Sequence, residues 1–180
     1  MSRNIWVISD THFNHANILT FKDSVGKPTR TFNSVEEMNE IMIQRWNEVV
    51  RPGDKVYHLG DVLFGLDKED WLNKNMPRLK GSKRLVFGNH DEPKHFVNTG
   101  HFNKTSLWRM FTEFNILLTH VPVHKSTLRE DRFDGKPVLN VHGHIHQNKS
   151  PEGPYHCVCV EQTDYRPVNI EDLTVIARNL

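Results

Sequence analysis

Cysteine is scarce in this chain of 180 residues, which contains only Cys157 and Cys159. Two cysteines are too few for the disulfide framework that holds many small secreted domains together, so we expect the fold to depend on a hydrophobic core. Their i, i+2 spacing on an alternating segment places both on one face of a strand, where we expect them to pack as small apolar groups. This use of cysteine is typical of a reducing compartment.

Long apolar runs are also missing. No stretch approaches the roughly 18–20 apolar residues that a membrane-spanning helix needs. The first motif described below begins at Ser9, which leaves no room for a signal or transit peptide ahead of it. From the sequence we therefore expect a soluble, cytoplasmic protein with no membrane partner.

The chain has no excess of charge of either sign, because 23 Lys and Arg are balanced by 22 Asp and Glu. A nearly neutral protein lacks the electrostatic field that attracts polyanions. The most basic stretch, residues 74–84, contains no aromatic side chains that could stack on bases, and we interpret it as a solvated loop. We therefore expect no general nucleic-acid binding.

Histidine, in contrast, is abundant, with 12 in the chain. Short apolar runs of the kind found in parallel strands cover residues 5–8, 55–59, 84–87, 116–119 and 138–141. Metal-ligand side chains follow these runs, namely Asp10, His12, Asp61, Asn89, His120, His144 and His146. Because open α/β sheets bind ligands beyond the carboxyl ends of their strands, we expect these side chains to converge. Seven nitrogen and oxygen donors are too many for one ion, so the sequence predicts a two-metal site.

Two helices are expected between the strands. Residues 34–37, Ser-Val-Glu-Glu, have the form of a capping box. Apolar side chains then recur at helical spacing over residues 35–49, and Pro52-Gly53 should end this helix. A second, shorter helix is expected after Asp67, whose side chain can cap it. The residues that should turn inward in that helix are Trp71 and Leu72.

The remaining segments complete the expected organisation. Residues 155–160 alternate like a strand, and Val175-Ile176 indicates another strand. Residues 20–33 and 122–137 are polar and are predicted to be loops, the second long enough to be a lid or binding loop. Strands that alternate with helices predict an α/β fold, and the length predicts a single domain over residues 1–180.

Five motifs in order resemble the calcineurin-like metallophosphoesterase family: Asp10-x-His12, Gly60-Asp61, Gly88-Asn89-His90-Asp91, His120 and Gly143-His144-x-His146. The resemblance implies a double-layered β sandwich flanked by helices, a four-layer αββα-like arrangement with a two-metal centre at its edge. It also implies a ligand set for each ion. Asp10, His12 and His146 would hold one ion, Asn89, His120 and His144 the other, and Asp61 would bridge both.

Elementary chemistry agrees with this assignment. Alternate residues of a strand point the same way, so Asp10 and His12 can reach one ion if the extended geometry persists. A carboxylate has two oxygens, so Asp61 can bridge ions about 3.5–4 Å apart. Nitrogen and oxygen ligands without thiolate suit Mn²⁺, our first choice, and also Fe, Co²⁺, Ni²⁺ or Zn²⁺.

Such a centre predicts a hydrolase. Two cations lower the pKa of a shared water from about 15.7 towards about 7, so a metal-bridging hydroxide can attack phosphorus. His90 is not needed as a ligand and is predicted to protonate the leaving alkoxide. Asp91 could orient that imidazole. His58 and His142 lie inside the predicted strands and should pack there instead.

The favoured substrate is a small phosphodiester, such as a nucleotide or an exposed nucleic-acid end. A diester carries one negative charge, and no Arg or Lys lies within the motifs to pair with the second charge of a monoester. The candidates for substrate contact are His15, His124, Arg129 and Arg132. A phosphomonoesterase acting on a nucleotide, sugar phosphate or phosphoprotein is the alternative, and a non-catalytic scaffold is a more distant one.

Overall fold

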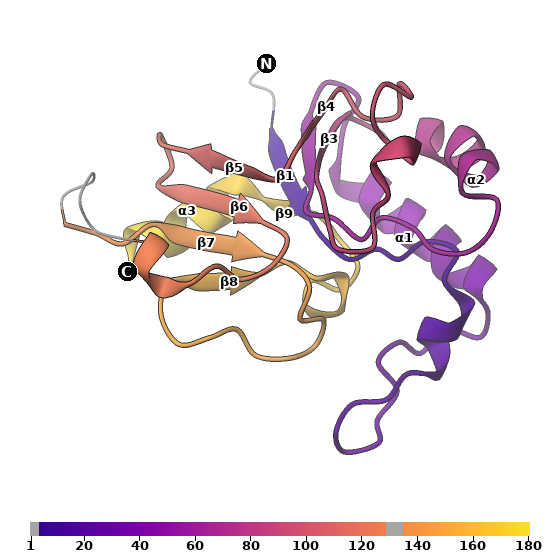
Figure 1. The fold of residues 1–180 in the computed structure, drawn as a ribbon, viewed down its shortest axis with the longest axis horizontal. Helices are drawn as coiled ribbons and strands as arrows, with labels where there is room; N and C mark the ends of the chain where they lie inside the picture. Colours follow the sequence, from indigo (N-terminus) through magenta and orange to yellow (C-terminus); the bar gives the residue numbers. More distant parts are fainter. Residues whose placement is uncertain (1–3, 129–134) are drawn as a thin grey trace.

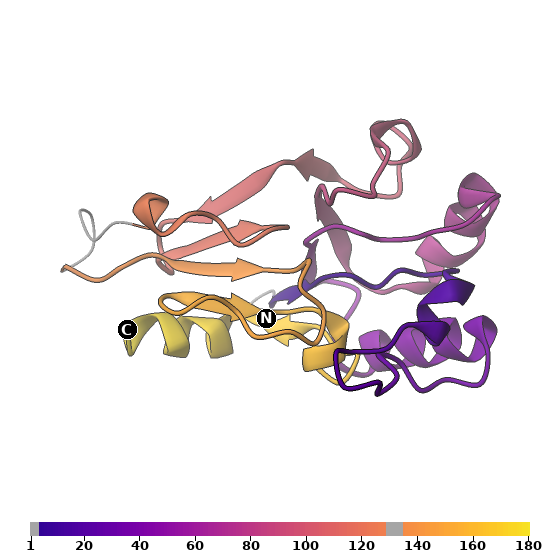
Figure 2. The ribbon, with the colours of Figure 1, turned by 60° about the horizontal axis from the view of Figure 1, so that its bottom comes forward.

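The computed structural model, which describes residues 4–128 and 135–180, contains two mixed β-sheets with helices packed against them (Figures 1 and 2). The first sheet has the order β4-β3-β2-β1-β9 and the second has the order β5-β6-β7-β8. This arrangement confirms the expected α/β fold. Among the described residues, no helix is long and apolar enough to cross a membrane.

The first sheet is mostly parallel. Its strands are β4 (Lys104–Ser106), β3 (Ser82–Val86), β2 (Lys55–His58), β1 (Ile5–Ile8) and β9 (Val168–Asn169). Strands β1 to β4 run parallel, and β9 is antiparallel to β1. Ile8 lies opposite His58, which lies opposite Leu85, so β1, β2 and β3 end at nearly the same level. The loops that follow these strands therefore start along one sheet edge.

The second sheet repeats this arrangement. Its strands are β5 (Trp108–Phe111), β6 (Ile116–Thr119), β7 (Leu139–His142) and β8 (Tyr155–Cys157). Strands β6, β7 and β8 are parallel, and β5 is antiparallel to β6. The strand predicted over residues 155–160 is shorter than expected, because β8 ends at Cys157. A 3-10 turn, η5 (Val160–Gln162), follows it.

Two hydrophobic clusters hold the layers together. One lies between the first sheet and the helices α1 (Val35–Val49) and α2 (Lys68–Asn75), and includes Trp46 and Leu72. The other joins the opposite face of the first sheet to the second sheet and to α3 (Ile170–Arg178). The remaining 3-10 turns are η1 (Ala16–Thr20), η2 (Met76–Arg78), η3 (Pro93–His95) and η4 (Lys125–Thr127).

The helix predictions are confirmed in part. Ser34 caps α1 by accepting a hydrogen bond from the Glu37 backbone N–H, as its capping box predicted. Asp67 does not cap α2 with its side chain, because it adopts a left-handed conformation with φ of +52°. The strand predicted at Val175-Ile176 is also wrong. These two residues lie in α3, whose amphipathic face packs against the second core cluster.

Candidate metal centre

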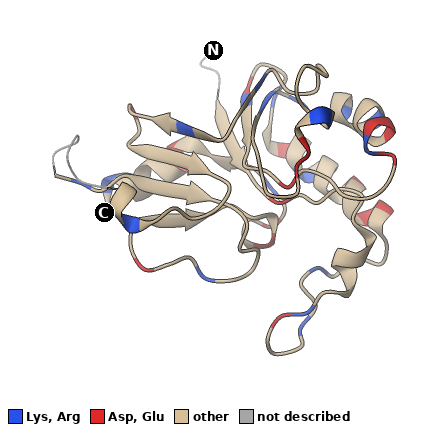
Figure 3. Cartoon of the chain, viewed as in Figure 1, with Lys and Arg blue, Asp and Glu red and all other residues tan. Residues whose placement is uncertain are grey.

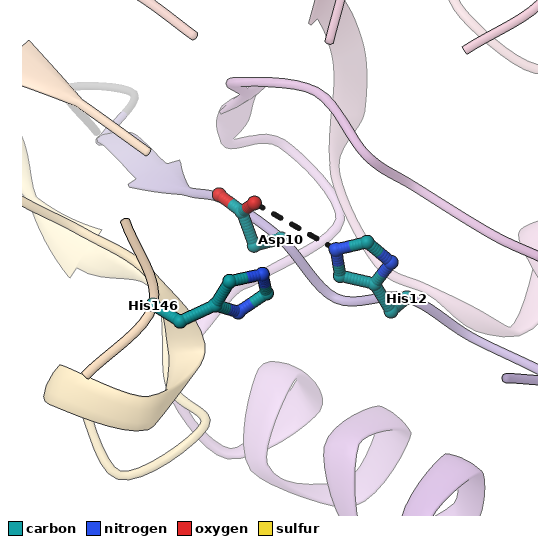
Figure 4. Close-up of side chains that lie close together, drawn as sticks. All are labelled: Asp10, His12 and His146. Carbon is teal, nitrogen blue, oxygen red and sulfur yellow. Dashed lines mark ion pairs between the residues drawn. The ribbon is translucent and has the colours of Figure 1, made fainter. Parts of the chain in front are cut away.

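The loops after five strands bring the predicted ligands together in two clusters. Asp10, His12 and His146 form the first cluster, shown in Figure 4, and Asp61, His120 and His144 form the second. Within each cluster, one ligand atom from each side chain lies within 4.8 Å of the others. The first sheet supplies Asp10, His12 and Asp61 after β1 and β2, whereas the histidines of residues 120, 144 and 146 follow β6 and β7 of the second sheet. The site therefore lies where the carboxyl ends of these strands of the two sheets meet.

The first cluster has ligand atoms that are buried and unused. The Oδ2 atom of Asp10 accepts hydrogen bonds from Ser9 Oγ at 2.5 Å, from the His144 backbone N–H at 2.8 Å and from Cys159 Sγ at 3.3 Å. Its Oδ1 atom has no hydrogen-bond partner among the described residues, and neither ring nitrogen of His12 has one. Buried polar atoms without partners are rare and costly. Here Asp10 Oδ1 and His12 Nε2 lie 3.7 Å apart, an arrangement that fits a cation.

Asp61 lies between the two clusters. Its Oδ2 atom is 3.6 Å from His12 Nε2 of the first cluster and 3.6 Å from His120 Nε2 of the second. Its Oδ1 atom accepts a hydrogen bond from the His90 backbone N–H at 3.0 Å, which fixes the carboxylate. Asn89 extends the second cluster, because its Oδ1 atom is 2.8 Å from His120 Nε2.

The ligand loops have an unusual backbone. Left-handed φ angles occur at Asp10 (+57°), His12 (+45°), Asp61 (+55°), His144 (+70°) and His146 (+52°). The extended geometry on which the spacing argument for Asp10 and His12 depended does not persist, and the two side chains meet through a turned backbone instead. Such conformations cost about 1–3 kcal/mol each and concentrate at functional sites. Backbone bonds between the loops hold them, since Asp10 N donates to Gly60 O and His12 N donates to Asp61 O.

Two glycines are required by close packing around the carboxylates. A side chain at Gly88 would collide with the Asp61 carboxylate and backbone, and one at Gly143 would collide with Ser9 and Asp10. Neither position has room for a Cβ atom, so only glycine at positions 88 and 143 allows these loops to approach Asp61 and Asp10.

Asp91 ties two ligand loops together. Its carboxylate accepts three backbone hydrogen bonds, from Asp61 at 2.9 Å, Gly88 at 2.8 Å and Val62 at 3.0 Å. Burial raises the pKa of Asp91, although these three donors oppose the shift. Among the described hydrogen bonds, none joins this carboxylate to the His90 ring. The role that the structure supports for Asp91 is therefore to hold the Asp61 loop.

The ring of His90 stands outside both clusters. It lies edge-on to Phe64 at 4.8 Å between centroids and 6.1 Å from the His12 ring. His15 also contacts this aromatic ring, stacked 4.2 Å from Phe64 at an interplanar angle of 12°. Burial and the nearby His12 lower the pKa of His15 to about 4, which keeps its ring neutral.

Of the other predicted substrate contacts, only His124 lies among the described residues. His124 is exposed and caps η4, where its Nδ1 atom accepts a hydrogen bond from the Ser126 backbone. Arg129 and Arg132 lie outside the described residues. His58 and His142 are buried in β2 and β7, as expected.

Behind the first cluster lies a buried ion pair that the sequence did not indicate. Arg30 Nη2 lies 2.7 Å from Glu161 Oε1, with both side chains almost fully buried. Arg30 also donates to the backbone carbonyls of Asp10 and Thr11 at 2.6 and 2.7 Å. The same Glu161 oxygen is 3.0 Å from His146 Nδ1. Arg30 falls in a segment predicted only as a loop, but Glu161 follows a predicted strand, as the ligands do, and this position could have drawn attention to it.

The comparisons with known proteins agree with this geometry. Residues 4–160 match the calcineurin-like phosphoesterase superfamily domain. An uncharacterized protein of Methanocaldococcus jannaschii is 35% identical over 176 residues, which cover 94% of this chain and 88% of that protein. The gene 66 protein of Mycobacterium phage L5 is 27% identical over 173 residues, covering 79% of this chain and 77% of that protein.

A solved structure shares the fold. The crystal structure of a protein of unknown function from Aquifex aeolicus superposes with a TM-score of 0.72 at 25% identity, covering 97% of this chain and 100% of that chain. The match to the domain model extends over all five motifs. The chain belongs to the calcineurin-like phosphoesterase superfamily.

Proposed function

We propose that this protein is a dinuclear metal-dependent phosphodiesterase. The observation that carries the proposal is the position of Asp61, whose Oδ2 atom lies 3.6 Å from a histidine nitrogen of each cluster. A carboxylate in this position can bridge two cations, the arrangement used by two-metal hydrolases.

The ligand set follows from the two clusters. Asp10, His12 and His146 would hold one ion, and His120, His144 and Asn89 the other, with Asp61 shared. Bound divalent ions, Mn²⁺ or another metal suited to nitrogen and oxygen donors, would polarise the phosphoryl group and activate a water molecule. The unused donor atoms of Asp10 and His12 support this assignment.

His90 is the proposed proton donor to the leaving oxygen. Its ring belongs to neither cluster but lies close to the first, and its backbone N–H donates a hydrogen bond to Asp61 Oδ1 at 3.0 Å. Packing against Phe64 restricts the ring, and the neutral His15 stacked on Phe64 offers a hydrogen-bonding group to substrate. General acid catalysis by a positioned histidine fits this geometry.

The charge around the centre supports a diester over a monoester. Arg30 is a buried cation behind the first cluster, but its guanidinium is paired with Glu161 and donates to the carbonyls of Asp10 and Thr11. Lys and Arg are spread along the chain in Figure 3 and do not gather at the strand ends. Among the described residues, the site therefore presents few fixed cations beyond the ions it would bind, which suits a substrate with one negative charge.

A direct test compares two substrates with the same leaving group. Protein stripped of metal and reloaded with Mn²⁺ should hydrolyse bis(4-nitrophenyl) phosphate with a higher kcat/KM than 4-nitrophenyl phosphate. Asp61→Asn should abolish both activities, whereas Asp164→Asn, at an exposed carboxylate, should leave them unchanged. A higher kcat/KM for the monoester would make the protein a phosphomonoesterase, and no hydrolysis of either ester with any of the candidate metals would reject the proposal.

A further inference from the structure

An apolar cavity of about 590 Å³ opens beside the second cluster. Asn89 and His120 line it, so the cavity and the candidate metal centre share a wall. Most other lining side chains are apolar, namely Phe87, Leu107, Trp108, Leu117, Val121 and Val123. No Lys, Arg, Asp or Glu is among the described residues that line it. The cavity therefore continues the phosphoryl site into an uncharged, apolar space.

The cavity wall leaves large apolar groups uncovered. Trp108 is 61% exposed and Leu107 is 75% exposed, although both belong to residue types that folding usually buries. The two threonine hydroxyls of the wall already donate to backbone carbonyls, Thr119 to Val121 at 2.6 Å and Thr127 to His124 at 2.8 Å. The wall thus offers contact area and an indole face but little hydrogen-bonding capacity, which suits an aromatic or other flat apolar group.

The position of the cavity relative to His90 indicates which part of the substrate it would hold. Asn89 and His90 are neighbours but point to different places. Asn89 reaches His120 and the cavity, whereas His90 packs against Phe64 and lies near His12. The alcohol that leaves needs the proton donor, so it should depart on the His90 side. The cavity then faces the ester group that stays on phosphorus.

We propose that this cavity binds an aromatic group on the retained ester oxygen, so that the natural substrates are phosphodiesters carrying such a group. This inference rests on the proposed phosphodiesterase function. In the reaction, the attacking water loses a proton to solvent and its oxygen forms the new bond to phosphorus. The bond from phosphorus to the alcohol oxygen beside His90 breaks, and His90 gives that alkoxide a proton and regains one from solvent. The product is a monoester whose aromatic group remains in the cavity.

The test holds the leaving group constant and varies the retained group. With Mn²⁺, the wild-type protein should hydrolyse phenyl 4-nitrophenyl phosphate with a kcat/KM at least about tenfold above that for methyl 4-nitrophenyl phosphate, the usual minimum for an added apolar group in a matching pocket. Trp108→Ala should lower kcat/KM for the phenyl ester and leave kcat/KM for the methyl ester nearly unchanged, which would remove most of this preference. Trp108→Phe keeps an aromatic ring and should keep the preference. Val175→Ala, at an apolar residue of α3 that is 56% exposed, is the matched control.

A binding measurement distinguishes failure of this inference from failure of the proposed function. Calorimetry on Mn²⁺-loaded protein should show tighter binding of diphenyl phosphate than of dimethyl phosphate, and Trp108→Ala should lose the difference, whether or not turnover is seen. Equal affinities and equal kcat/KM values in the wild type would overturn the inference while leaving the phosphodiesterase intact. A wild-type dimer that Trp108→Ala converts to a monomer, with no change in either preference, would assign the cavity wall to a second copy of the chain and would also overturn it.

Discussion

Glu161 accepts a hydrogen bond from the Nδ1 atom of His146 at 3.0 Å, and this contact would prepare the histidine to bind a metal. A neutral imidazole that donates through Nδ1 has no proton on Nε2, which is the form that binds a metal. Although burial opposes the charged form of Glu161, Arg30 and His146 together outweigh it and hold the pKa of this carboxyl below its usual value. The carboxylate is therefore charged where it can orient the ring.

Removing that charge should weaken metal binding at the first cluster. Glu161→Gln is expected to lower affinity for the ion held by Asp10, His12 and His146 by about 10–100-fold, the usual effect of losing such a partner. Titration calorimetry with Mn²⁺ should show one weakened site and one retained site. Glu152→Gln, at an exposed position, is the control. Unchanged affinity at both sites in Glu161→Gln would remove this contact from the metal centre.

The Arg30–Glu161 ion pair should also contribute strongly to stability. Arg30→Met leaves the buried Glu161 carboxylate without its paired cation and two backbone carbonyls without their donor, and breaking a buried pair in this way costs about 3–5 kcal/mol. Urea unfolding of metal-free protein measures the loss. Arg45→Ala, which breaks a more exposed pair with Asp164, should cost at most about 1 kcal/mol. Equal, small losses in both variants would contradict the structural role assigned to Arg30.

His90→Ala separates the proton donor from the ligands. The variant should keep its metal content but lose about 10²–10⁴-fold in rate, the usual contribution of a general acid. The loss should be smaller for 4-nitrophenyl esters, whose leaving group needs little protonation, than for alkyl esters. Equal losses for good and poor leaving groups would exclude His90 as the acid.

His58 should make the fold sensitive to acid. Its Nδ1 atom accepts a hydrogen bond from the Gly60 backbone, which leaves the proton on Nε2, 2.9 Å from Thr11 Oγ1. Burial, more than the neighbouring histidines, lowers the pKa of His58 to about 3, below its ordinary value of 6.5. The unfolded chain therefore binds a proton between these values that the folded chain does not, so stability falls as the pH drops below 6.5.

The size of this effect can be measured by difference. Between pH 7.5 and pH 5, His58 should account for about 1–2 kcal/mol of the loss in unfolding free energy. The difference between metal-free wild type and His58→Gln in urea unfolding at both pH values isolates it. Curves of stability against pH that run parallel would show that His58 does not take up the proton.

Most of the metal centre could be predicted because its signals are local. Each ligand follows a short apolar run, and the parallel register at Ile8, His58 and Leu85 brings the loops to one edge. The helix at 35–49 was equally predictable, because its cap and its apolar spacing lie in one stretch of chain.

The features that were missed depend on contacts distant in sequence. Arg30 and Glu161 are separated by 131 positions, and neither residue carries a local sign of burial. The β-branched Val175-Ile176 favoured a strand, but packing of an amphipathic face against the second core cluster made it helical. The left-handed backbone at Asp10 and His12 is imposed by bonds to the loop after β2, so strand periodicity could not predict it.

Two ions are predicted to share Asp61, and metal content measured together with activity tests this most directly. Wild-type protein dialysed against Mn²⁺ and analysed by plasma emission should contain two ions per chain at full activity. Asp61→Asn should lose affinity at both sites and retain little activity, whereas Asn89→Ala should empty mainly the site of His120 and His144. A wild-type protein that is fully active with one ion per chain would contradict a centre in which two ions share Asp61.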